Sequence, residues 1–397
     1  MIFNSLGSNY NFGFVVKSLF SFPSNSSEFK LKSVLNKKYD GETVLLYKGR
    51  EAIKLALEIS GLPKGSKVGV NGFTCFVVNQ AIVEAGYKPV YLDIGDWDLN
   101  FEINNLEKHK DIKALVIQNT LGCPIDIVSV KSFCVKNNIL IIEDLAHSAG
   151  GYYSDGNEIG CIGDFTALSF SQDKIIDAVS GGALIVRNKK FASGLAKIKY
   201  EDLPFGNKIR DRFYPVLTFK IRKLYSVGLG KVLHFFLKRS GLLSDPMGTI
   251  SDIKYHILPS WYARIALFSL ENLDHQIRHR REIAKIYIKN LNENLLSLGV
   301  IKNCDLSTNI RFPIFIENRA MLIRYLKSNG IFISDIWYDA PIAPQKLIKR
   351  TGYNGECPKA EIDAKQILNL PTHINVSEKD AEKIAALINK WLNTNQK

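Results

Sequence analysis

The sequence predicts an α/β protein whose large domain contains a mostly parallel, seven-stranded sheet. Short β-rich segments alternate with helical segments from residue 44 to residue 186, which is typical of parallel sheets. Several β-rich segments are apolar at every position, as strands are when helices cover both faces of the sheet. The predicted strands are residues 44–48, 67–71, 88–94, 113–119, 139–144, 166–171 and 181–187. The segments between them repeat apolar residues at helical spacing, at residues 51–59, 75–86 and 127–138.

A different pattern in the C-terminal third predicts a smaller α+β domain. Residues 263–299 have the pattern of one long amphipathic helix, with or without a kink. The elements expected after it are strand 310–316, helix 319–330, strand 331–337 and helix 378–392. We therefore assign residues 1–250 to an N-terminal segment and the large domain, and residues 251–397 to the small domain.

The composition is that of a folded globular chain. Of the 397 residues, 46% are hydrophobic and 23% are charged, which excludes a mostly disordered chain. No run of about 18 apolar residues predicts a membrane-spanning helix. The six cysteines are scattered and form no CxxC pair, so we expect neither a metal site nor a redox dithiol. Because no secretory pattern is present near residue 1, we expect a cytoplasmic protein.

The positive charge is concentrated in one stretch. Residues 206–241 contain nine Lys or Arg residues and one acid, Asp211, so they carry +8 of the net charge of +13. Because the charge is local, no nucleic-acid partner is expected. Residues 213–239 mix aromatic, aliphatic and cationic side chains, which leaves two interpretations open: peripheral contact with the inner membrane face, or an ordinary amphipathic helix pair. The second is favoured by residues that interrupt a long helix: Pro215, Gly228 and Gly230.

Polar residues at the ends of predicted strands indicate where the chemistry takes place. In an open parallel sheet, ligands bind outside the carboxyl ends of the strands. Asp144 ends one strand, Lys174 follows another, and Gly49 leads from a third into a helix. A helix N-terminus suits a phosphate, a carboxylate can hold a cationic ring nitrogen, and a buried lysine can form an imine. These are the groups that bind pyridoxal 5'-phosphate (PLP).

Each of these residues also has an ordinary structural interpretation. Lys174 alone is a solvated loop lysine beside Asp173, and Asp144 alone is a helix cap. Gly49 can simply relieve a tight turn, and Ser169 can be a satisfied strand hydroxyl. Because these residues occur together, each at the end of a predicted strand, a functional site is favoured over the separate structural interpretations.

Ordered motifs add a resemblance to one family. Residues 141–186 follow the order EDxAxxxG, GxxGD, SFxxxK and GG before an apolar strand. Supporting blocks lie at residues 48–57, 85–94 and 357–384. The sequence thereby resembles, over residues 44–392, the DegT/DnrJ/EryC1/StrS group of sugar aminotransferases, which have the fold-type I architecture and use PLP.

The resemblance implies roles for the residues near the cofactor ring. Lys174 stands at the position of the Schiff-base lysine, which also carries a proton during the reaction. Asp144 stands where the family pairs a carboxylate with the pyridine nitrogen. His147 stands where Gln or His is usual, beside the ring hydroxyl.

The resemblance also implies a phosphate site. Ser169, five residues before Lys174, matches the serine that binds the phosphate. Gly49, Arg50 and Glu51 match the helix N-terminus that holds the phosphate through backbone N–H groups. Arg50 replaces a usual Thr, and its cation can add a contact.

Three features depart from the family pattern. Cys75 stands where an aromatic residue usually stacks on the ring, and Phe76 is the candidate substitute. The Asn-Tyr-Arg segment that reaches the partner subunit's phosphate is not recognisable around residues 255–257. The basic stretch at residues 206–241 is an insertion where a short connection is expected.

The resemblance implies transfer of an amino group from glutamate to a nucleotide-linked keto-sugar, for amino-sugar or surface-polysaccharide synthesis, by a homodimer. One alternative is a PLP-dependent sugar dehydratase or lyase of the same family. The presence of Lys174 argues against it, because a His replaces this lysine in that branch. The other alternative is a non-catalytic, membrane-peripheral protein on the same scaffold.

Overall fold

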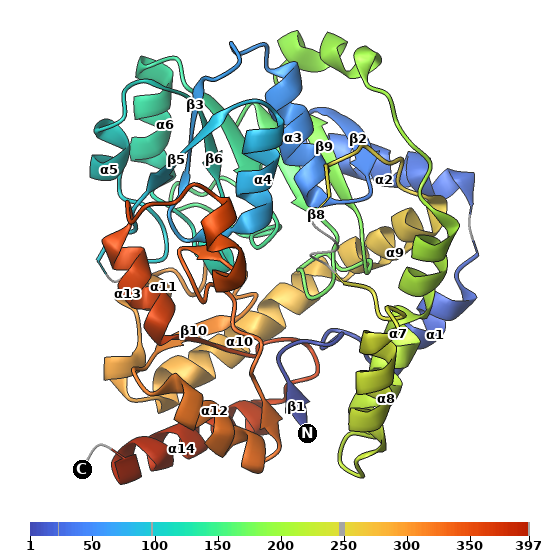
Figure 1. Cartoon of the computed structure of the whole chain (residues 1–397), viewed down its shortest axis with the longest axis vertical. Coiled ribbons are helices and arrows are strands. Elements are labelled where there is room, and N and C mark those ends of the chain that lie inside the picture. Colours follow the sequence, from blue (N-terminus) through green and yellow to red (C-terminus); the bar gives the residue numbers. More distant parts are fainter. Residues whose placement is uncertain (23, 97, 246–250, 396–397) are drawn as a thin grey trace.

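A seven-stranded sheet occupies the centre of the larger part of the molecule (Figure 1). The computed structural model describes residues 1–22, 24–96, 98–245 and 251–395. The strands, in spatial order, are β2 (Glu42–Leu46), β9 (Gly182–Val186), β8 (Phe165–Ser169), β7 (Leu140–Asp144), β6 (Ile112–Ile117), β3 (Lys67–Asn71) and β5 (Lys88–Leu92). Only β9 runs antiparallel to its neighbours, and the remaining pairs are parallel. The predicted fold class and all seven predicted strands are confirmed.

Helices cover the sheet, which explains the continuously apolar strands. The helix α3 (Gly49–Ile59) packs on β8 and β9, and α2 (Asn25–Tyr39) packs on α9 (Ser260–Glu271). The other helices of this part are α4 (Phe76–Glu84), α5 (Ile103–Glu107) and α6 (Ile127–Lys136). The strand side chains of Val68, Leu115 and Ile142 are completely buried, as expected for strands covered on both faces.

The predicted long helix is two helices. The helices α9 and α10 (Leu273–Asn290) meet at Asn272, whose side chain donates a hydrogen bond to Phe268 O (2.8 Å). The backbone of Asn272 leaves the helical range there, with φ −103° and ψ 8°. The segment after α10 forms only the short helix α11 (Leu298–Lys302) instead of continuing to residue 299 as one helix. In Figure 1 the two helices run below the sheet and connect the larger part to the smaller one.

The smaller part contains short strands and three helices. The strand β10 (Phe312–Phe315) pairs antiparallel with β13 (Ile367–Leu370), and the helices are α12 (Arg319–Ser328), α13 (Pro358–Gln366) and α14 (Glu378–Asn395). The predicted strand 331–337 is shorter than expected, because β11 (Ile331–Phe332) ends after two residues. The chain then returns to the larger part of the molecule, where β12 (Ile342–Ala343) pairs with β4 (Thr74–Cys75).

The first residues of the chain join the C-terminal part. The strand β1 (Ile2–Phe3) pairs parallel with β11, and His373 Nε2 lies 2.7 Å from Phe3 O. After β1, Tyr10 donates from its hydroxyl to Asp177 Oδ1 (2.8 Å). The N-terminal segment therefore ties the C-terminal strands to the loop that follows β8.

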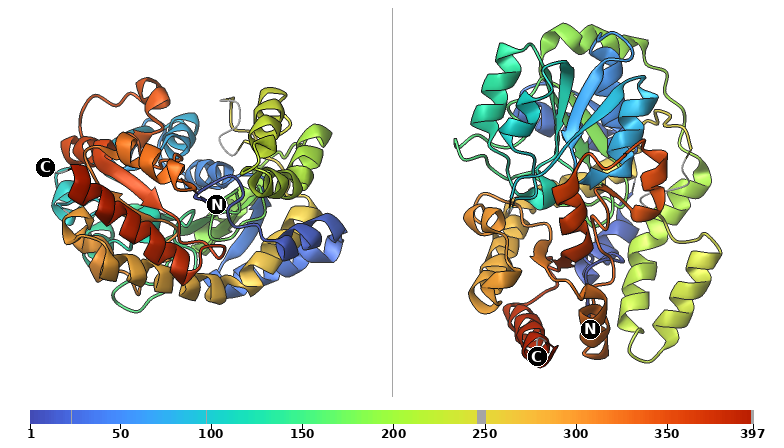
Figure 2. Two further views of the ribbon diagram at one scale, coloured as in Figure 1. Left: turned by 90° about the horizontal axis from the view of Figure 1, so that it is seen from below. Right: turned by 60° about the vertical axis from the view of Figure 1, so that its left-hand side comes forward.

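The basic stretch forms a helical hairpin. Figure 1 and the right view of Figure 2 show α7 (Phe205–Lys223) and α8 (Leu229–Arg239) as a pair at the edge of the molecule, away from the sheet. Gly228 forms the turn with φ +82°, whereas Pro215 lies inside α7 without ending it. Gly230 permits close packing, because a Cβ there would lie 2.2 Å from Ile221 O. No helix in the described ranges is long and apolar enough to cross a membrane.

Candidate active site

Neighbouring parallel strands bring three predicted residues to one edge of the sheet. Asp144 ends β7, and Ala167 of β8 lies opposite it in the register. The turn after β7 carries His147, and the loop after β8 carries Lys174. Lys174 Nζ lies 3.0 Å from His147 Nε2, and the Lys174 charge also acts on Asp144. The structure therefore places Asp144, His147 and Lys174 together at the carboxyl edge.

The hydrogen bonds of His147 define which ring nitrogen carries the proton. His147 Nδ1 receives Leu121 N–H at 3.2 Å and lies 3.1 Å from the Tyr338 hydroxyl. Because a backbone N–H can only donate, Nδ1 is the acceptor and the proton of the neutral ring is on Nε2. The Nε2–H group then points at Lys174 Nζ and requires a lone pair there. The arrangement therefore favours the neutral amine form of Lys174.

Burial favours the same protonation states. Burial lowers the pKa of Lys174, although the nearby Cys75 and Asp144 act in the opposite direction. Burial also lowers the pKa of His147 well below its usual value, and the Lys174 charge adds to this effect. A neutral amine is the nucleophilic form of lysine, so Lys174 is suited to attack an aldehyde.

Asp144 presents a carboxylate oxygen to the same space. Burial raises its pKa to about 6, partly offset by the hydrogen bond from Ala146 N and by the Lys174 charge. Asp144 Oδ1 accepts that bond at 3.0 Å, whereas Oδ2 accepts none within the described ranges. At neutral pH the carboxylate is mostly ionised and has an oxygen available for a cationic N–H group.

A second set of groups lies at the N-terminus of α3. A Cβ on Gly49 would lie 2.9 Å from Ser169 Cβ, so the helix start and the end of β8 are in contact. The Ser169 hydroxyl makes no hydrogen bond to the part of the protein that the structure describes. Helix N-terminal amides together with a hydroxyl suit a phosphate group.

Arg50 and Glu51 follow Gly49 but differ in where they point. Arg50 Nη1 approaches Gln80 Oε1 at 3.4 Å, and burial lowers the pKa of this guanidinium. The Glu51 carboxylate turns away from the β8 end and accepts from His256 N (3.0 Å). The amide of Glu51 donates to Lys48 O (3.1 Å). The Glu51 side chain thus anchors the segment around His256, which is where the Asn-Tyr-Arg motif was not recognisable.

Cys75 lies between the two sets of groups. It is the residue before α4, and its thiol is close enough to influence the pKa of both Lys174 and Arg50. Phe76 begins α4 and is only 4% exposed. The structure therefore places Cys75 beside Lys174, while Phe76 is buried in the first turn of the helix.

Two site residues were not identified from the sequence. The Trp337 ring stacks on the His147 ring, with centroids 5.1 Å apart and an interplanar angle of 15°. Lys174 Nζ lies 4.4 Å from the Trp337 ring centroid. Tyr338 adopts φ +67°, and its hydroxyl accepts from Gln118 Nε2 (2.6 Å) while it faces His147. Because residues 331–337 were predicted to be a strand, the strand-end rule could have pointed to Trp337.

Arg311 packs on the same indole. Its guanidinium carbon lies 3.8 Å from the Trp337 ring centroid, and its Nη2 forms an ion pair with Asp335 (2.8 Å). The small part of the molecule thereby supplies an indole that covers His147 and Lys174 and a guanidinium that packs on this indole. Such a layer limits the access of water to the amine.

The chemistry of these residues fits PLP. A neutral amine suits its aldehyde, the open oxygen of Asp144 suits its ring nitrogen, and Ser169 with the start of α3 suits its phosphate. Around the aldehyde, the ring nitrogen and the phosphate, the protein thus offers a group that the described residues leave available for binding.

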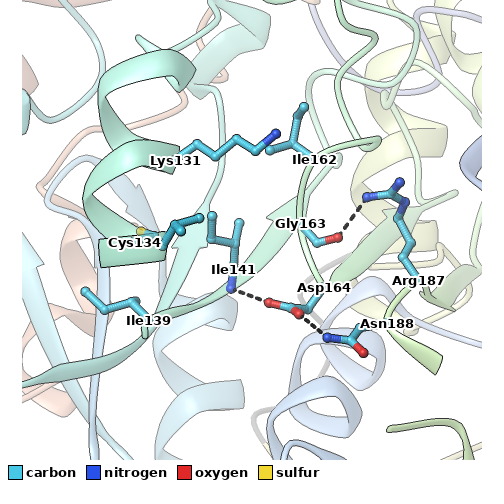
Figure 3. Close-up of a pocket in the computed structure, with 10 residues that line it drawn as sticks. Lys131, Cys134, Ile139, Ile141, Ile162, Gly163, Asp164, Arg187 and Asn188 are labelled. Atoms are coloured by element: carbon cyan, nitrogen blue, oxygen red, sulfur yellow. Dashed lines mark hydrogen bonds between the residues drawn. The ribbon is translucent and has the colours of Figure 1, made fainter. Parts of the chain in front are cut away.

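A surface depression lies elsewhere. It has a volume of about 280 Å³ and lies at the amino ends of β7 and β8, at the opposite edge of the sheet (Figure 3). Its polar groups bind one another: Asp164 accepts from Ile141 N (3.1 Å) and from Asn188 Nδ2 (2.7 Å). Arg187 Nη1 donates to Gly163 O (2.8 Å). These bonds stabilise the strand starts and use the polar groups of Asp164 and Asn188 within the protein.

Comparison with protein families gives one match over most of the chain. Residues 36–222 and 252–389 match the model of the DegT/DnrJ/EryC1/StrS aminotransferase family. The unmatched segment between the two ranges, residues 223–251, contains all of α8.

Individual relatives are distant but cover most of the chain. A pleiotropic regulatory protein of Geobacillus stearothermophilus is 25% identical over 346 residues, which are 86% of this chain and 82% of that protein. A GDP-perosamine synthase of Vibrio cholerae is 22% identical over 354 residues, covering 87% and 85%. The structure of Helicobacter pylori PseC, an aminotransferase involved in the biosynthesis of pseudoaminic acid, has the same fold, with a TM-score of 0.71 at 18% identity over 96% of each chain.

Proposed function

Because the chain belongs to the DegT/DnrJ/EryC1/StrS aminotransferase family, we propose that it is a PLP-dependent aminotransferase that moves an amino group from glutamate to a nucleotide-linked keto-sugar. The observation that carries this proposal is the Nε2–H of His147 directed at Lys174 Nζ, which holds the lysine neutral. The name of the V. cholerae relative supports a sugar nucleotide as the substrate class.

The cofactor supplies an aldehyde and an electron-withdrawing ring that delocalises the electron pair of a breaking C–H bond. In the proposal, Lys174 Nζ would hold the cofactor through its aldehyde group and, as a free amine, would carry the proton. Asp144 Oδ2 would hold the proton of the ring nitrogen. Ser169 and the amides of Gly49 and Arg50 would hold the phosphate.

Residues of both parts orient these groups. Tyr338 and the Leu121 amide fix the imidazole of His147, so that its Nε2–H stays directed toward Lys174. Trp337 stacks on the imidazole, Arg311 packs on Trp337, and this layer limits the access of water to the amine. An amine in a low-dielectric space stays neutral and exchanges protons readily near neutral pH.

Two other functions remain as alternatives. A lyase on the same scaffold would use the same cofactor, but the presence of a neutral Lys174 favours amino transfer. A non-catalytic regulator is suggested by the name of the Geobacillus relative. A non-catalytic function does not explain why the Lys174 amine is buried near the Asp144 carboxylate, whose Oδ2 accepts no hydrogen bond from the described residues.

The test combines trapping with product analysis. The protein is mixed with PLP, reduced with borohydride and digested, and we expect the pyridoxyl group on Lys174. L-glutamate with a panel of nucleotide-linked keto-sugars should then release 2-oxoglutarate and an aminated sugar, while Lys174→Ala gives neither adduct nor product. An absent adduct contradicts the cofactor assignment. An adduct with a dehydrated sugar and no 2-oxoglutarate identifies the lyase. Light scattering should show a homodimer.

A further inference from the structure

The hairpin of α7 and α8 exposes a row of large apolar side chains. We define the hairpin surface as the exposed apolar residues of this pair, and those on α8 are 54–62% exposed. The members on α8 are Leu229, Val232, Phe235 and Phe236, and those on and beside α7 include Phe205, Ile209, Phe213 and Leu224. Two adjacent phenylalanines exposed on a helix form an apolar patch that is unusual for a surface in contact only with water.

The helix α8 has apolar residues on two sides. Gly230 is buried, and Leu233 and Leu237 are half-buried. At 3.6 residues per turn, Leu229, Val232 and Phe236 follow one another at intervals of three and four and form a different stripe, which faces solvent. Packing within the hairpin uses only the side of α8 that contains Gly230, Leu233 and Leu237. The solvent-facing stripe is therefore available to an external partner.

The exposed charges of the hairpin are all positive. Five cations are exposed: Lys220, Lys223, Lys231, Lys238 and Arg239. The only acid between residues 205 and 244, Asp211, is buried and accepts from the hydroxyls of Tyr47 (2.7 Å) and Tyr262 (3.0 Å). Two further cations hold the hairpin against the N-terminal segment: Arg212 donates to Leu19 O (2.9 Å) and Arg222 to Tyr10 O (2.6 Å).

This combination of exposed phenyl groups and cations is complementary to an anionic lipid bilayer. The stripe of α8 suits the acyl boundary, and the flanking lysines suit phosphate headgroups. A second copy of the hairpin is a poorer partner, because a symmetric contact would bring its unneutralised cations against one another. The match to the family leaves α8 out, so its surface is not explained by the family's shared chemistry.

We propose that the hairpin surface binds the protein to anionic membranes, with α8 lying in the plane of the interface. This inference goes beyond the proposed amino transfer and does not depend on it. The membrane would bring the enzyme to the place where lipid-linked or surface-directed sugars are assembled, without adding any group to the carboxyl edge of the sheet.

The experiment measures sedimentation of the full chain with large vesicles. Vesicles of phosphatidylcholine with one quarter phosphatidylglycerol are compared with vesicles of phosphatidylcholine alone. Wild-type protein should bind the anionic vesicles selectively and lose binding as salt rises. The double variant Phe235→Ser/Phe236→Ser should weaken partitioning by about tenfold or more, because two exposed rings no longer enter the interface. Lys231→Gln/Lys238→Gln/Arg239→Gln should weaken it by about a hundredfold at low salt.

A control variant replaces two apolar residues of similar fractional exposure elsewhere on the surface. Val128 and Val135 on α6 are 55% and 70% exposed, and Val128→Ser/Val135→Ser should bind vesicles as the wild type does. All hairpin variants should keep the PLP absorbance, so that loss of membrane binding is separate from loss of the cofactor site. The proposal is overturned if wild-type protein ignores anionic vesicles, if the phenylalanine variant binds them unchanged, or if that variant converts a dimer to a monomer without vesicles.

Discussion

The amino and carboxyl edges of the central sheet each carry an aspartate, but the two aspartates differ in how completely the described residues satisfy their hydrogen bonding. At the amino edge, Asp164 binds Ile141 N and Asn188 Nδ2, and its neighbours bind backbone carbonyls. At the carboxyl edge, Asp144 keeps one oxygen that accepts no hydrogen bond from the described residues. A hollow lies at the amino edge (Figure 3), whereas the groups that we propose to react lie at the carboxyl edge.

The difference shows that an open space is not enough to identify this site. Polar groups that are satisfied by the chain itself stabilise the fold and have no capacity left for a ligand. Groups that the chain buries and leaves available cost folding free energy, which a bound ligand can recover. Substitution of Asp by Asn should therefore raise the free energy of unfolding at the carboxyl edge and lower it at the amino edge.

The largest expected effect is on catalysis at Asp144. Asp144→Asn removes the negative charge that we propose holds the ring nitrogen proton, and amino transfer should fall by about a hundredfold or more. The measurement is 2-oxoglutarate release at saturating PLP, with Asp164→Asn as the matched control. Equal loss in both variants would show that the two edges do not differ in function.

The second effect is on the stability of the cofactor-free protein. Burial raises the folded-state pKa of Asp144 to about 6, so its ionisation destabilises the fold as pH rises through that value. Asp144→Asn should therefore raise the free energy of unfolding at pH 8 by about 2–3 kcal/mol and have no such effect below pH 4. Urea denaturation at both pH values measures this. If Asp144→Asn were less stable than wild type at pH 8, the ionised Asp144 carboxylate would already be stabilised by other groups of the folded protein.

The third effect has the opposite sign at the amino edge. Asp164→Asn replaces an acceptor of two hydrogen bonds with a group whose N–H competes with Asn188, so the free energy of unfolding should fall by about 1–2 kcal/mol. Denaturation by urea gives the value, and amino transfer should stay within about twofold of wild type. A strong loss of activity would indicate a ligand in the depression of Figure 3.

The smallest effect tests the hydrogen bond to His147. Tyr338→Phe removes one of two donors to Nδ1, so the pKa of Lys174 should rise and borohydride trapping at pH 7 should slow by about three- to tenfold. The pH profile of trapping should move to higher pH, which a purely structural role would not cause. Tyr152→Phe, at a 42% exposed tyrosine, is the control. An unshifted profile would contradict the assigned tautomer.

Local patterns were sufficient for the sheet and for the strand-end residues. Apolar strands such as β7 and β8 are recognisable because burial on both faces leaves few polar positions. Parallel neighbours then bring Asp144 and Lys174 to one edge, as expected from their places at the carboxyl ends of predicted strands.

The contributions of distant segments were not predictable in the same way. Trp337 and Tyr338 lie far along the chain from His147, and Tyr338 has a left-handed backbone that a strand pattern does not reveal. The separation of α9 from α10 at Asn272 depends on one local backbone departure within a continuous apolar pattern. The direction of the Glu51 side chain depends on His256, whose position only the tertiary structure gives.

The pairing of β1 with β11 has a consequence for biosynthesis. During translation, Ile2 and Phe3 are synthesised more than three hundred codons before their partners Ile331 and Phe332. This two-stranded sheet can therefore close only after the segment that contains β11 has left the ribosome. A chaperone that binds residues 2 and 3 before then would delay the pairing of β1 with β11.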